Sequence, residues 1–577
     1  MTKKNRINNN DVAQELNKIA NLLEIKGANR FRVRAYRNAA YTIESLTDSI
    51  ADLVSQEKDL TQLAEIGNDL AGKIKTIVET GTDPLLEDLK KEIPEELSEL
   101  LGLKGMGPKK IATLYNTLDI KTADDLREAA EKHKIQEVSG FGAITEKNIL
   151  EELDRWQGEQ KRYSLALADQ IAKPYLEYLK MTKKVISLEI VGSYRRRKET
   201  VGDIDILATC KRGTDMMDRF NEYEDVEKIL SKGKTRSTVM LKSGIQVDLR
   251  VVPQVAFGAA MHYFTGSKTH NIACRKIAVN KQLKLNEYGL FKGDDRIAGR
   301  TEKEIYAELD LPFIQPELRE NRGEIEAGQK GKLPELVTLD DLRGDLHVHT
   351  KATDGHHSVK EMVEAAREKG YEYLAITDHS KKVSIANGLD TGRLRKQIEE
   401  IDKLQPEFKD IRILKSIEVD ILKDGSLDLP DNVLKELDLT VCSVHYNFGL
   451  SRKEQTERIL KAMDNPYMNI LGHPSGRLIN KREPLDLDME TIMQAAIERN
   501  IYLEINSDPD RLDLNDIYCK LGKEIGVKMV VSTDAHSKDN LNLIHFGIGQ
   551  ARRGWLEKED VLNTLSWEEL KKELKRK

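Results

Sequence analysis

The sequence predicts a multidomain protein in which a helical N-terminal part is followed by α/β parts, and three observations support this prediction. The chain has 577 residues, enough for about three to four domains of roughly 150 residues. Through residue 155, apolar residues recur at the three- and four-residue spacing of amphipathic helices. Short apolar runs typical of strands begin near residue 160, and after residue 344 such runs alternate with helical stretches.

Composition excludes several classes of protein. Hydrophobic residues make up 39% of the chain and charged residues 33%, which is typical of a soluble globular protein. No stretch approaches the roughly 18 uninterrupted apolar residues of a membrane span, and the polar N-terminus lacks the apolar core of a signal peptide. The four cysteines lie far apart without a CxxC pair, which argues against a disulfide framework. We therefore expect a cytoplasmic protein with no membrane partner.

The net charge of −6 conceals an uneven distribution along the chain. Residues 160–339 carry 32 Lys+Arg against 25 Asp+Glu, an excess of +7. Residues 1–159 carry 23 against 29, and residues 340–577 carry 37 against 44, so both flanks are acidic. A basic middle favours a polyanionic partner there, although an excess of this size also occurs on solvated surfaces.

Three N-terminal segments, residues 64–81, 103–116 and 138–150, share the order of small-residue turn, glycine and amphipathic helix. Backbone N–H groups at a helix start can bind a phosphate oxygen, and glycine allows the phosphate to approach. A single turn of this kind is a plain glycine helix cap about as often as it is a phosphate-binding site, but three copies favour phosphate binding. The segments resemble the helix-hairpin-helix motif, a sequence-independent clamp on the DNA backbone. The residues expected to contact DNA are Gly67, Gly105, Gly107, Lys109, Lys110, Gly140 and Gly142.

Three aspartates lie on apolar strands of the basic middle. Asp203 and Asp205 alternate with Ile204 and Ile206, so both carboxylates face one side of a strand, and Asp248 lies on a second apolar strand. If the strands are neighbours, the carboxylates converge and repel unless a cation such as Mg²⁺ neutralises them. Two ions at such a site can activate an attacking hydroxyl and stabilise a leaving pyrophosphate. A DxD pair alone is more often an exposed strand edge.

These residues, together with "GSYRRR" at 192–197 and "YFTGSKTHNIACRK" at 263–276, resemble the nucleotidyltransferase fold of family X DNA polymerases such as DNA polymerase beta. The resemblance implies that Asp203 and Asp205 bind two Mg²⁺ or Mn²⁺ ions and that Asp248 helps to activate the primer 3′-hydroxyl. It also implies three sets of nucleotide contacts. The triphosphate would be bound by Ser193, Arg196 and Gly202, with Gly192 as a further contact, and the sugar would be lined by Tyr263, Phe264 and Gly266. Asn271 and Arg275 would approach the base pair. Lys268 departs from the acidic residue of the vertebrate protein, which puts base stacking in doubt.

The same resemblance extends to the N-terminus, where vertebrate homologues have a lyase domain with a Schiff-base lysine. Aligning the first hairpin places Lys73 at that lysine. A lysine nucleophile needs a depressed pKa, whereas a single lysine on a helix is usually just solvated. Lys73 is therefore a candidate catalytic residue, and an ordinary solvated lysine is an equally good interpretation.

Nine of the twelve histidines follow residue 344, and six of them lie at or near the ends of apolar runs. Seven strand-like runs separated by helical stretches predict a closed parallel barrel with its chemistry at the C-terminal strand ends. Nine ligand-type residues exceed the needs of one metal ion and suit about three ions of Zn²⁺ or Mn²⁺. They are His347, His349, Asp354, His379, Glu418, His445, His473, Asp534 and His536.

The C-terminal runs "DLHVHT", "TDH", "SVHY", "GHP" and "STDAH" are similar to motifs of the PHP (polymerase and histidinol phosphatase) domain. This resemblance implies a distorted (β/α)7 barrel that hydrolyses phosphate esters, acting as a 3′–5′ exonuclease and in some members on abasic sites. Arg511 could hold a substrate phosphate, although a loop arginine more often forms a surface salt bridge.

The resemblance covers the chain from about residue 7 to residue 570. We expect a bacterial-type family X DNA polymerase with a C-terminal PHP domain, acting as a monomer on gapped or nicked DNA with dNTPs. A nucleotidyltransferase on RNA or a small molecule with a PHP phosphatase is one alternative, and a non-catalytic repair scaffold is another. The expected domains are an 8-kDa-like domain (1–90), a fingers-like domain (91–155), a palm (156–255), a thumb (256–317), a linker (318–340) and a PHP domain (341–577).

Overall fold

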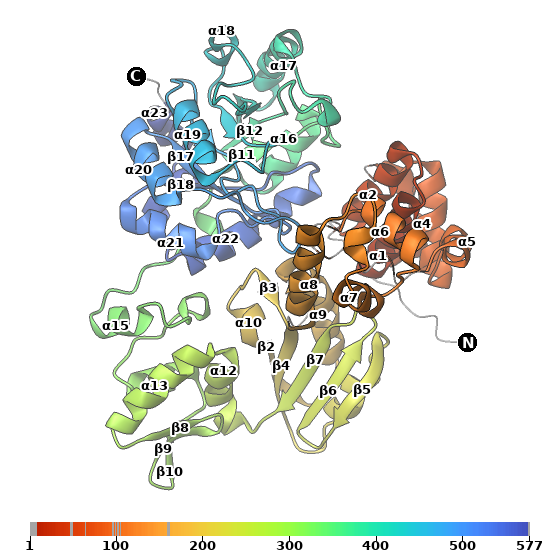
Figure 1. Ribbon diagram of the computed structural model, residues 1–577. Coiled ribbons are helices and arrows are strands. Elements are labelled where there is room, and N and C mark those ends of the chain that lie inside the picture. The colour runs from red at the N-terminus through yellow and green to blue at the C-terminus, as the bar shows by residue number, and fades with distance from the viewer. Residues whose placement is uncertain are drawn as a thin grey trace. The chain divides into compact units, whose positions relative to one another are not determined.

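The computed structural model describes residues 9–44, 46, 50–63, 65–94, 97, 100, 103, 106–158 and 162–574. The chain divides into two compact units (Figure 1). The first comprises Met1–Tyr163, Tyr223–Lys228 and Met240–Ile245, and the second comprises Ser164–Glu222, Ile229–Val239 and Gln246–Lys577. Among the helices of the described residues, none is long and apolar enough to cross a membrane.

The first unit is helical, as its apolar spacing predicts. Its helices are α1 (Asn9–Ile25), α2 (Arg30–Glu44), α3 (Ile50–Ser55), α4 (Asn68–Thr80), α5 (Pro84–Glu92), α6 (Pro108–Leu118), α7 (Ala123–Glu131) and α8 (Ala143–Gly158). Local signals set their ends: Thr122 and Asp125 form a capping box at the start of α7, and Gly81 ends α4 with a φ of 90°.

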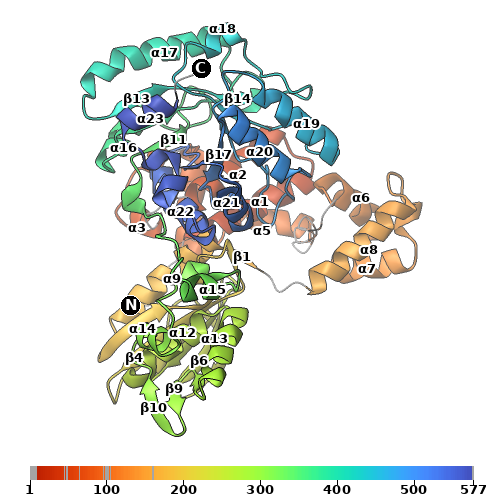
Figure 2. The same ribbon diagram turned by 90° about the vertical axis from the view of Figure 1, so that its left-hand side faces the viewer.

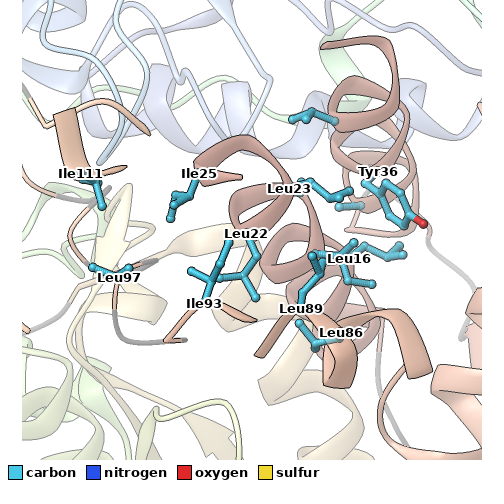
Figure 3. Close-up of a cluster of buried hydrophobic side chains, with 14 of the residues drawn as sticks. Leu16, Leu22, Leu23, Ile25, Tyr36, Leu86, Leu89, Ile93, Leu97 and Ile111 are labelled. Atoms are coloured by element: carbon cyan, nitrogen blue, oxygen red, sulfur yellow. The ribbon is translucent and has the colours of Figure 1, made fainter. Parts of the chain in front are cut away.

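A single hydrophobic cluster, from Val12 to Leu153, runs through this unit. Figure 3 shows Leu16, Leu22 and Ile25 of α1 near Leu89 and Ile93 at the α5 end. The cluster continues across residue 90, where the sequence analysis places the boundary between the expected domains 1–90 and 91–155. The helical period of a sequence shows which face of a helix is apolar and not which other helix covers that face.

The second unit begins with an α/β region around the five-stranded sheet β2-β4-β7-β6-β5. The elements of this region are β1 (Tyr163–Ser164), α9 (Leu165–Lys180), β2 (Val185–Ile190), α10 (Gly192–Arg195), β3 (Thr200–Val201), β4 (Asp203–Cys210), α11 (Met216–Asn221), β5 (Val226–Lys232), β6 (Arg236–Leu241) and β7 (Gln246–Val251). The central strands β4 and β7 run parallel, and Ile204, Ile206 and Val247 are buried as their alternation predicts.

A smaller α/β region follows, with α12 (Phe257–Thr265), α13 (Lys268–Asn280), the antiparallel sheet β8 (Lys284–Asn286), β9 (Gly289–Lys292) and β10 (Asp295–Ala298), then α14 (Glu302–Glu308) and α15 (Glu324–Gln329). Residues 318–340, expected as a linker, include α15, and the side chains of Arg319 and Glu324 are fully buried. The Arg319 guanidinium donates to Glu302 Oε1 at 2.6 Å, so charges that look like linker polarity are paired inside the fold.

Seven strand runs form the C-terminal barrel, as the sequence predicts. The strands are β11 (Gly344–Val348), β12 (Tyr373–Ile376), β13 (Arg412–Lys415) with β14 (Glu418–Asp420), β15 (Val441–Ser443), β16 (Ile470–Leu471), β17 (Tyr502–Asn506) and β18 (Met529–Ser532). They form the sheets β11-β12-β13 and β14-β15-β16-β17-β18, whose pairs are parallel. Isolated bridges Val348↔Ala535 and His379↔Glu418 join the two sheets into a ring.

Helices surround these strands in both views (Figures 1 and 2). They are α16 (Val359–Glu368), α17 (Thr391–Leu404), α18 (Asp431–Leu434), α19 (Arg452–Met463), α20 (Met489–Arg499), α21 (Asp516–Ile525), α22 (Ile544–Arg553) and α23 (Trp567–Glu573). Because the strands are covered by helices, they read as nearly continuous apolar runs, and the polar residues that interrupt them collect at the strand ends.

Candidate functional site

The three strand aspartates lie together at one point of the central sheet. Strand β4 pairs with β7 in a register that places Asp205 directly beside Asp248, and Asp203 lies two residues earlier on β4. One carboxylate oxygen from each of the three lies within 4.8 Å of the others. This cluster, here called the carboxylate site, is the arrangement that the sequence predicts for neighbouring strands.

The electrostatics of the carboxylate site fit a divalent cation. Burial, followed by the charges of Asp203 and Asp248, raises the pKa of Asp205 to about 7. Burial and repulsion disfavour the ionised carboxylate, and a bound cation would favour it. Oxygen ligands of this kind suit Mg²⁺ or Mn²⁺.

Neighbouring side chains hold Asp248 in place. Its Oδ1 accepts hydrogen bonds from Thr238 Oγ1 at 2.5 Å and Arg236 Nη2 at 3.4 Å, and its Oδ2 accepts one from Gln246 Nε2 at 2.7 Å. The three donors come from β6 and β7, so the sheet itself orients this carboxylate.

The turn after β2, residues 192–197 and here called the phosphate turn, packs directly on the carboxylate site. Gly192 has a φ of +67°, and a Cβ there would lie 2.7 Å from Asp205 Oδ2. Glycine is therefore required both by the backbone conformation and by the close approach. Ser193 lies in the short helix α10 of this turn, and Gly202 directly precedes β4, so both border the carboxylate site.

Arg196, expected to hold the triphosphate, is engaged with protein groups in the structure. Its Nε donates to Glu320 Oε1 at 3.0 Å, and its Nη1 donates to the backbone carbonyl of Thr265. A nucleotide phosphate would compete with these acceptors.

The expected sugar and base contacts lie at the junction of α12 and α13. Tyr263 is 36% exposed and meets Phe264 edge to face at 5.1 Å. Asn271 Nδ2 donates to the Tyr263 carbonyl at 2.7 Å, and Arg275 Nε donates to the Asn271 carbonyl at 3.3 Å. Gly266 lies between the helices with a φ of +70°, and the amide oxygen of Asn271 has no hydrogen-bond partner although it is buried.

The helix-hairpin-helix glycines of the first unit leave their helix starts open. Gly67 and Gly107 are the N-caps of α4 and α6, and neither helix has a side-chain cap. A Cβ at Gly67, Gly107, Gly140 or Gly142 would meet nothing within 4 Å. Lys109 is exposed, Lys110 Nζ lies 5.9 Å from the centroid of Phe141, and Gly105 is outside the described residues. These starts are therefore accessible to a phosphate.

Lys73 lies on α4 with its side chain 21% exposed, and its Nζ is 3.8 Å from Asp83 Oδ1. A carboxylate therefore lies close to the amine that a Schiff-base role would require. We expect borohydride to trap only a weak covalent adduct with DNA carrying a 5′-deoxyribose phosphate. Lys73→Ala should abolish this adduct, and Lys75→Ala on the same helix should retain it. Absence of any adduct with the unsubstituted protein would contradict the role of Lys73.

The nine ligand-type residues of the barrel meet at its C-terminal strand ends, and we call them the barrel metal site. Ligand atoms lie within 4.8 Å of one another in three groups: His349, Asp354, His379 and His536; His347, His349 and Asp534; and His379, Glu418 and His445. His473 joins them, since its Nε2 lies 3.0 Å from Glu418 Oε1. Two histidines belong to two groups each, as in a site that holds adjacent ions.

Buried atoms of the barrel metal site lack hydrogen-bond partners, which is the fit expected for metal ligands. They include His347 Nε2, His349 Nδ1 and Asp354 Oδ1. Burial, followed by the positive charges of His536 and His379, lowers the pKa of His349 to about 4, so its imidazole is neutral and able to coordinate. The same donor set of nitrogen and oxygen atoms suits Mn²⁺ or Zn²⁺.

Two carboxylates beside the ligands were not identified from the sequence. Glu504 accepts from His347 Nδ1 at 2.6 Å, and Asp420 lies 3.2 Å from His445 Nδ1, so each fixes a ring whose other nitrogen faces the cluster. Both lie on strand runs that end near ligands, and Asp420 follows Glu418 by two residues on the same strand. This spacing could have identified Asp420 from the sequence. Arg511 Nε lies 3.7 Å from Asp534 Oδ2, and its buried Nη1 has no hydrogen-bond partner.

His262, His270 and Cys274 form another buried cluster, on α12 and α13. His270 Nδ1 contacts Glu324 Oε1 at 2.7 Å and Nε2 contacts the Tyr306 hydroxyl at 2.9 Å, so both ring nitrogens are occupied. Burial, with the charge of Arg319 next, lowers the pKa of His262 far below its usual value. A fixed cation beside the rings disfavours a second cation, and we interpret this cluster as hydrogen-bonded core.

Models of known families match consecutive parts of the chain. They are a helix-hairpin-helix domain (residues 7–83), a SAM-like helix-hairpin-helix tandem (97–155), the DNA polymerase beta palm (167–253), the DNA polymerase beta thumb (260–320) and the PHP domain (345–508). The palm contains the carboxylate site and the phosphate turn, and Asp534 and His536 of the barrel metal site lie beyond the matched part of the PHP domain.

A relative that covers nearly the whole chain identifies its family. A Bacillus subtilis (strain 168) protein named DNA polymerase/3′-5′ exonuclease PolX is 37% identical over 570 residues, which cover 98% of this chain and 99% of the relative. A probable phosphatase of Thermoanaerobacter sp. (strain X514) is 31% identical over 38% of this chain and 90% of its own length. The crystal structure of a Leishmania infantum polymerase beta ternary complex is 22% identical, covers 39% of this chain and 98% of its own, and has a TM-score of 0.27. The chain thus belongs to the PolX group of family X DNA polymerases, in which a polymerase beta-like palm and thumb precede a PHP domain.

Proposed function

We propose that the chain fills gaps in DNA by template-directed transfer of nucleotides from dNTPs and processes 3′ ends with a 3′–5′ exonuclease in its PHP barrel. The observation that carries the polymerase proposal is the register of β4 and β7, which pairs Asp205 with Asp248 directly beneath Gly192 of the phosphate turn. A triphosphate bound at the turn would therefore lie against the carboxylates.

The proposed polymerase roles divide among the residues of the palm and thumb. Asp203 and Asp205 would hold two Mg²⁺ or Mn²⁺ ions, which when bound activate the primer hydroxyl and stabilise the leaving pyrophosphate. Asp248, fixed by Thr238 and Gln246, would orient the primer end. Ser193 and Arg196 would bind the triphosphate, while Tyr263 and Gly266 at the α12 end would border the sugar.

The proposed exonuclease roles belong to the barrel. The nine ligand residues would hold about three ions of Mn²⁺ or Zn²⁺, which when bound supply hydroxide near neutral pH. A cavity of about 340 Å³ is lined, among others, by the cations Lys382, Lys423 and Arg458, by Tyr446 and by the carboxylates Asp420 and Asp424. Cations and an aromatic ring are side chains that bind single-stranded nucleic acid, so this cavity suits a DNA 3′ end. Cleavage at abasic sites is the further activity that such a barrel would support.

Two other functions compete with this proposal. A nucleotidyltransferase acting on RNA or a small molecule needs no set of open helix starts like those at Gly67 and Gly107. A scaffold that only binds DNA gains nothing from unpartnered buried ligand atoms, which cost stability when no ion is bound. We therefore propose gapped or nicked DNA and dNTPs as the partners, and we propose a monomer as the form that binds them.

One denaturing gel separates the three functions. The full chain is incubated with end-labelled, one-nucleotide-gapped DNA in Mg²⁺ or Mn²⁺, with and without dNTPs. We expect extension of the primer by one nucleotide with dNTPs and shortening from the 3′ end without them. Shortening alone would favour a phosphoesterase with a different transferase substrate, and an unchanged primer under all conditions would favour the scaffold.

A further inference from the structure

Helix α22 of the barrel carries an arginine that reaches the polymerase site. Arg553, in the last turn of the helix, has a side chain only 3% exposed. Its Nη1 donates to the backbone carbonyl of Arg196 at 2.8 Å and to Glu320 Oε1 at 3.0 Å. Its Nη2 donates to Asp516 Oδ2 at 2.6 Å, at the start of α21. A buried guanidinium with three acceptors from three parts of the chain holds those parts in a fixed geometry.

One carboxylate oxygen connects Arg553 with the phosphate turn. Glu320 Oε1 accepts from Arg553 Nη1 and also from Arg196 Nε, each at 3.0 Å. Although burial opposes it, the charges of Arg196 and Arg553 lower the pKa of Glu320, so the carboxylate stays ionised between two cations. Arg322 Nη2 donates to Asp516 at 2.6 Å and extends the alternation of charges.

This arrangement allows Arg196 to be released for a nucleotide. If Arg196 turns toward a triphosphate, it leaves Glu320, and a partly buried carboxylate without a cation is destabilising. Arg553 remains as the partner of Glu320, so the carboxylate stays neutralised when Arg196 departs. The bond from Arg553 to the Arg196 carbonyl meanwhile keeps the backbone of the phosphate turn in place.

We propose that Arg553 of the PHP barrel is a positioning residue for dNTP binding in the palm, which couples the nuclease domain to the affinity of the polymerase for its nucleotide. The proposal rests on the polymerase function proposed above. Without Arg553, Glu320 would pair with Arg196 alone and hold it away from the triphosphate, and the turn would lose the donor to its carbonyl. Both changes weaken dNTP binding and neither alters the carboxylate site.

Other contacts hold the barrel against the palm, so loss of Arg553 need not separate them. Arg477 forms two hydrogen bonds with Glu199, at 2.7 and 3.2 Å, and the Arg197 guanidinium lies over the Phe546 ring at 5.8 Å. Arg552 offers a matched control, because it is the neighbouring arginine of α22 and bonds Glu317 Oε1 at 2.7 Å and the Val337 carbonyl at 3.1 Å instead.

The test is single-nucleotide insertion on one-nucleotide-gapped DNA by the full chain with Arg553→Gln, Arg553→Lys or Arg552→Gln. We expect Arg553→Gln to raise the KM for dNTP about tenfold, in the range found for residues that couple two sites, with kcat within about twofold. Arg553→Lys should fall between Arg553→Gln and the unsubstituted chain, and Arg552→Gln should match the latter. Exonuclease rates on single-stranded DNA should stay within about twofold throughout.

A double-mutant cycle tests the route through Glu320. If Arg553 acts by sharing this carboxylate, Arg553→Gln should raise KM less in a Glu320→Gln background than alone. An unchanged KM in Arg553→Gln would overturn the coupling, and equal effects of Arg552→Gln and Arg553→Gln would replace it with a general loss of helix α22. Parallel loss of both activities with a lower melting temperature would overturn it in favour of a structural role. Failure of the unsubstituted chain to extend the primer would instead contradict the polymerase function itself.

Discussion

Replacing Asp205 with alanine is expected to lower nucleotide incorporation by about 100-fold or more while the exonuclease rate stays within about twofold. Losing a residue that only supports a metal ligand costs about 10- to 100-fold, so losing a ligand shared by two ions should cost at least the upper value. Burial, followed by the charges of Asp203 and Asp248, also raises the pKa of Asp205 to about 7, so a bound cation would stabilise its ionised form. The measurement is single-turnover extension of gapped DNA beside 3′ digestion of single-stranded DNA.

Asp203→Ala should behave like Asp205→Ala, because both carboxylates belong to the same cluster. Asp218→Ala is the matched control, since Asp218 on α11 has an exposed side chain paired with Lys232 at 2.9 Å and belongs to none of the ligand groups among the described residues. Full extension by Asp205→Ala would show that the carboxylate site is not the polymerase site. Loss of both activities in Asp205→Ala would show that the two sites depend on one another.

His347→Ala is expected to have the opposite effect, lowering 3′ digestion by about 100-fold or more and leaving gap filling within about twofold. The ring is fully buried, with Nδ1 fixed by Glu504 and Nε2 directed at Glu418 and Asp534, each 3.6 Å away. An alanine would remove one ligand and leave the Glu504 carboxylate without its donor. Metal content by elemental analysis should fall with the activity, which separates ligand loss from a change in DNA binding.

His445→Ala should give the same pattern, because His445 Nε2 lies 3.3 Å from Glu418 Oε1 in another ligand group. His357→Ala is the control within the barrel, since this histidine belongs to none of the ligand groups among the described residues. Normal digestion by His347→Ala would place the nuclease chemistry elsewhere. A matching loss in His357→Ala would point to general destabilisation of the barrel.

Local residue patterns account for most of what could be predicted about both sites. Alternation along one strand is enough to place Asp203 and Asp205 on one face, and the recurrence of histidine after apolar runs is enough to place His379, His445 and His473 at strand ends. These features depend on the period of a single element, which a sequence records directly. Conclusions about catalysis drew in addition on the resemblance to family X polymerases and PHP domains.

Features that depend on packing between distant segments were not predictable. Glu504 supports His347 across 157 residues, and Arg553 reaches Arg196 across 357, and neither partner is implied by its own neighbours in sequence. Arg319 and Glu324 look like linker residues because polarity alone does not reveal whether a charge is solvated or paired inside the fold.

The two sheets of the barrel meet at two seams, each formed by an isolated bridge, and this has a consequence for its mechanics. At one seam, His379 pairs with Glu418, and the Glu418 carbonyl accepts from Ser380 N at 2.9 Å. At the other, His349 N donates to the Ala535 carbonyl at 2.8 Å, between Asp534 and His536. The two sheets are therefore joined by few main-chain hydrogen bonds at the places where the ligand residues are most dense. Ions bound by these residues would link the two sheets and so stabilise the barrel itself.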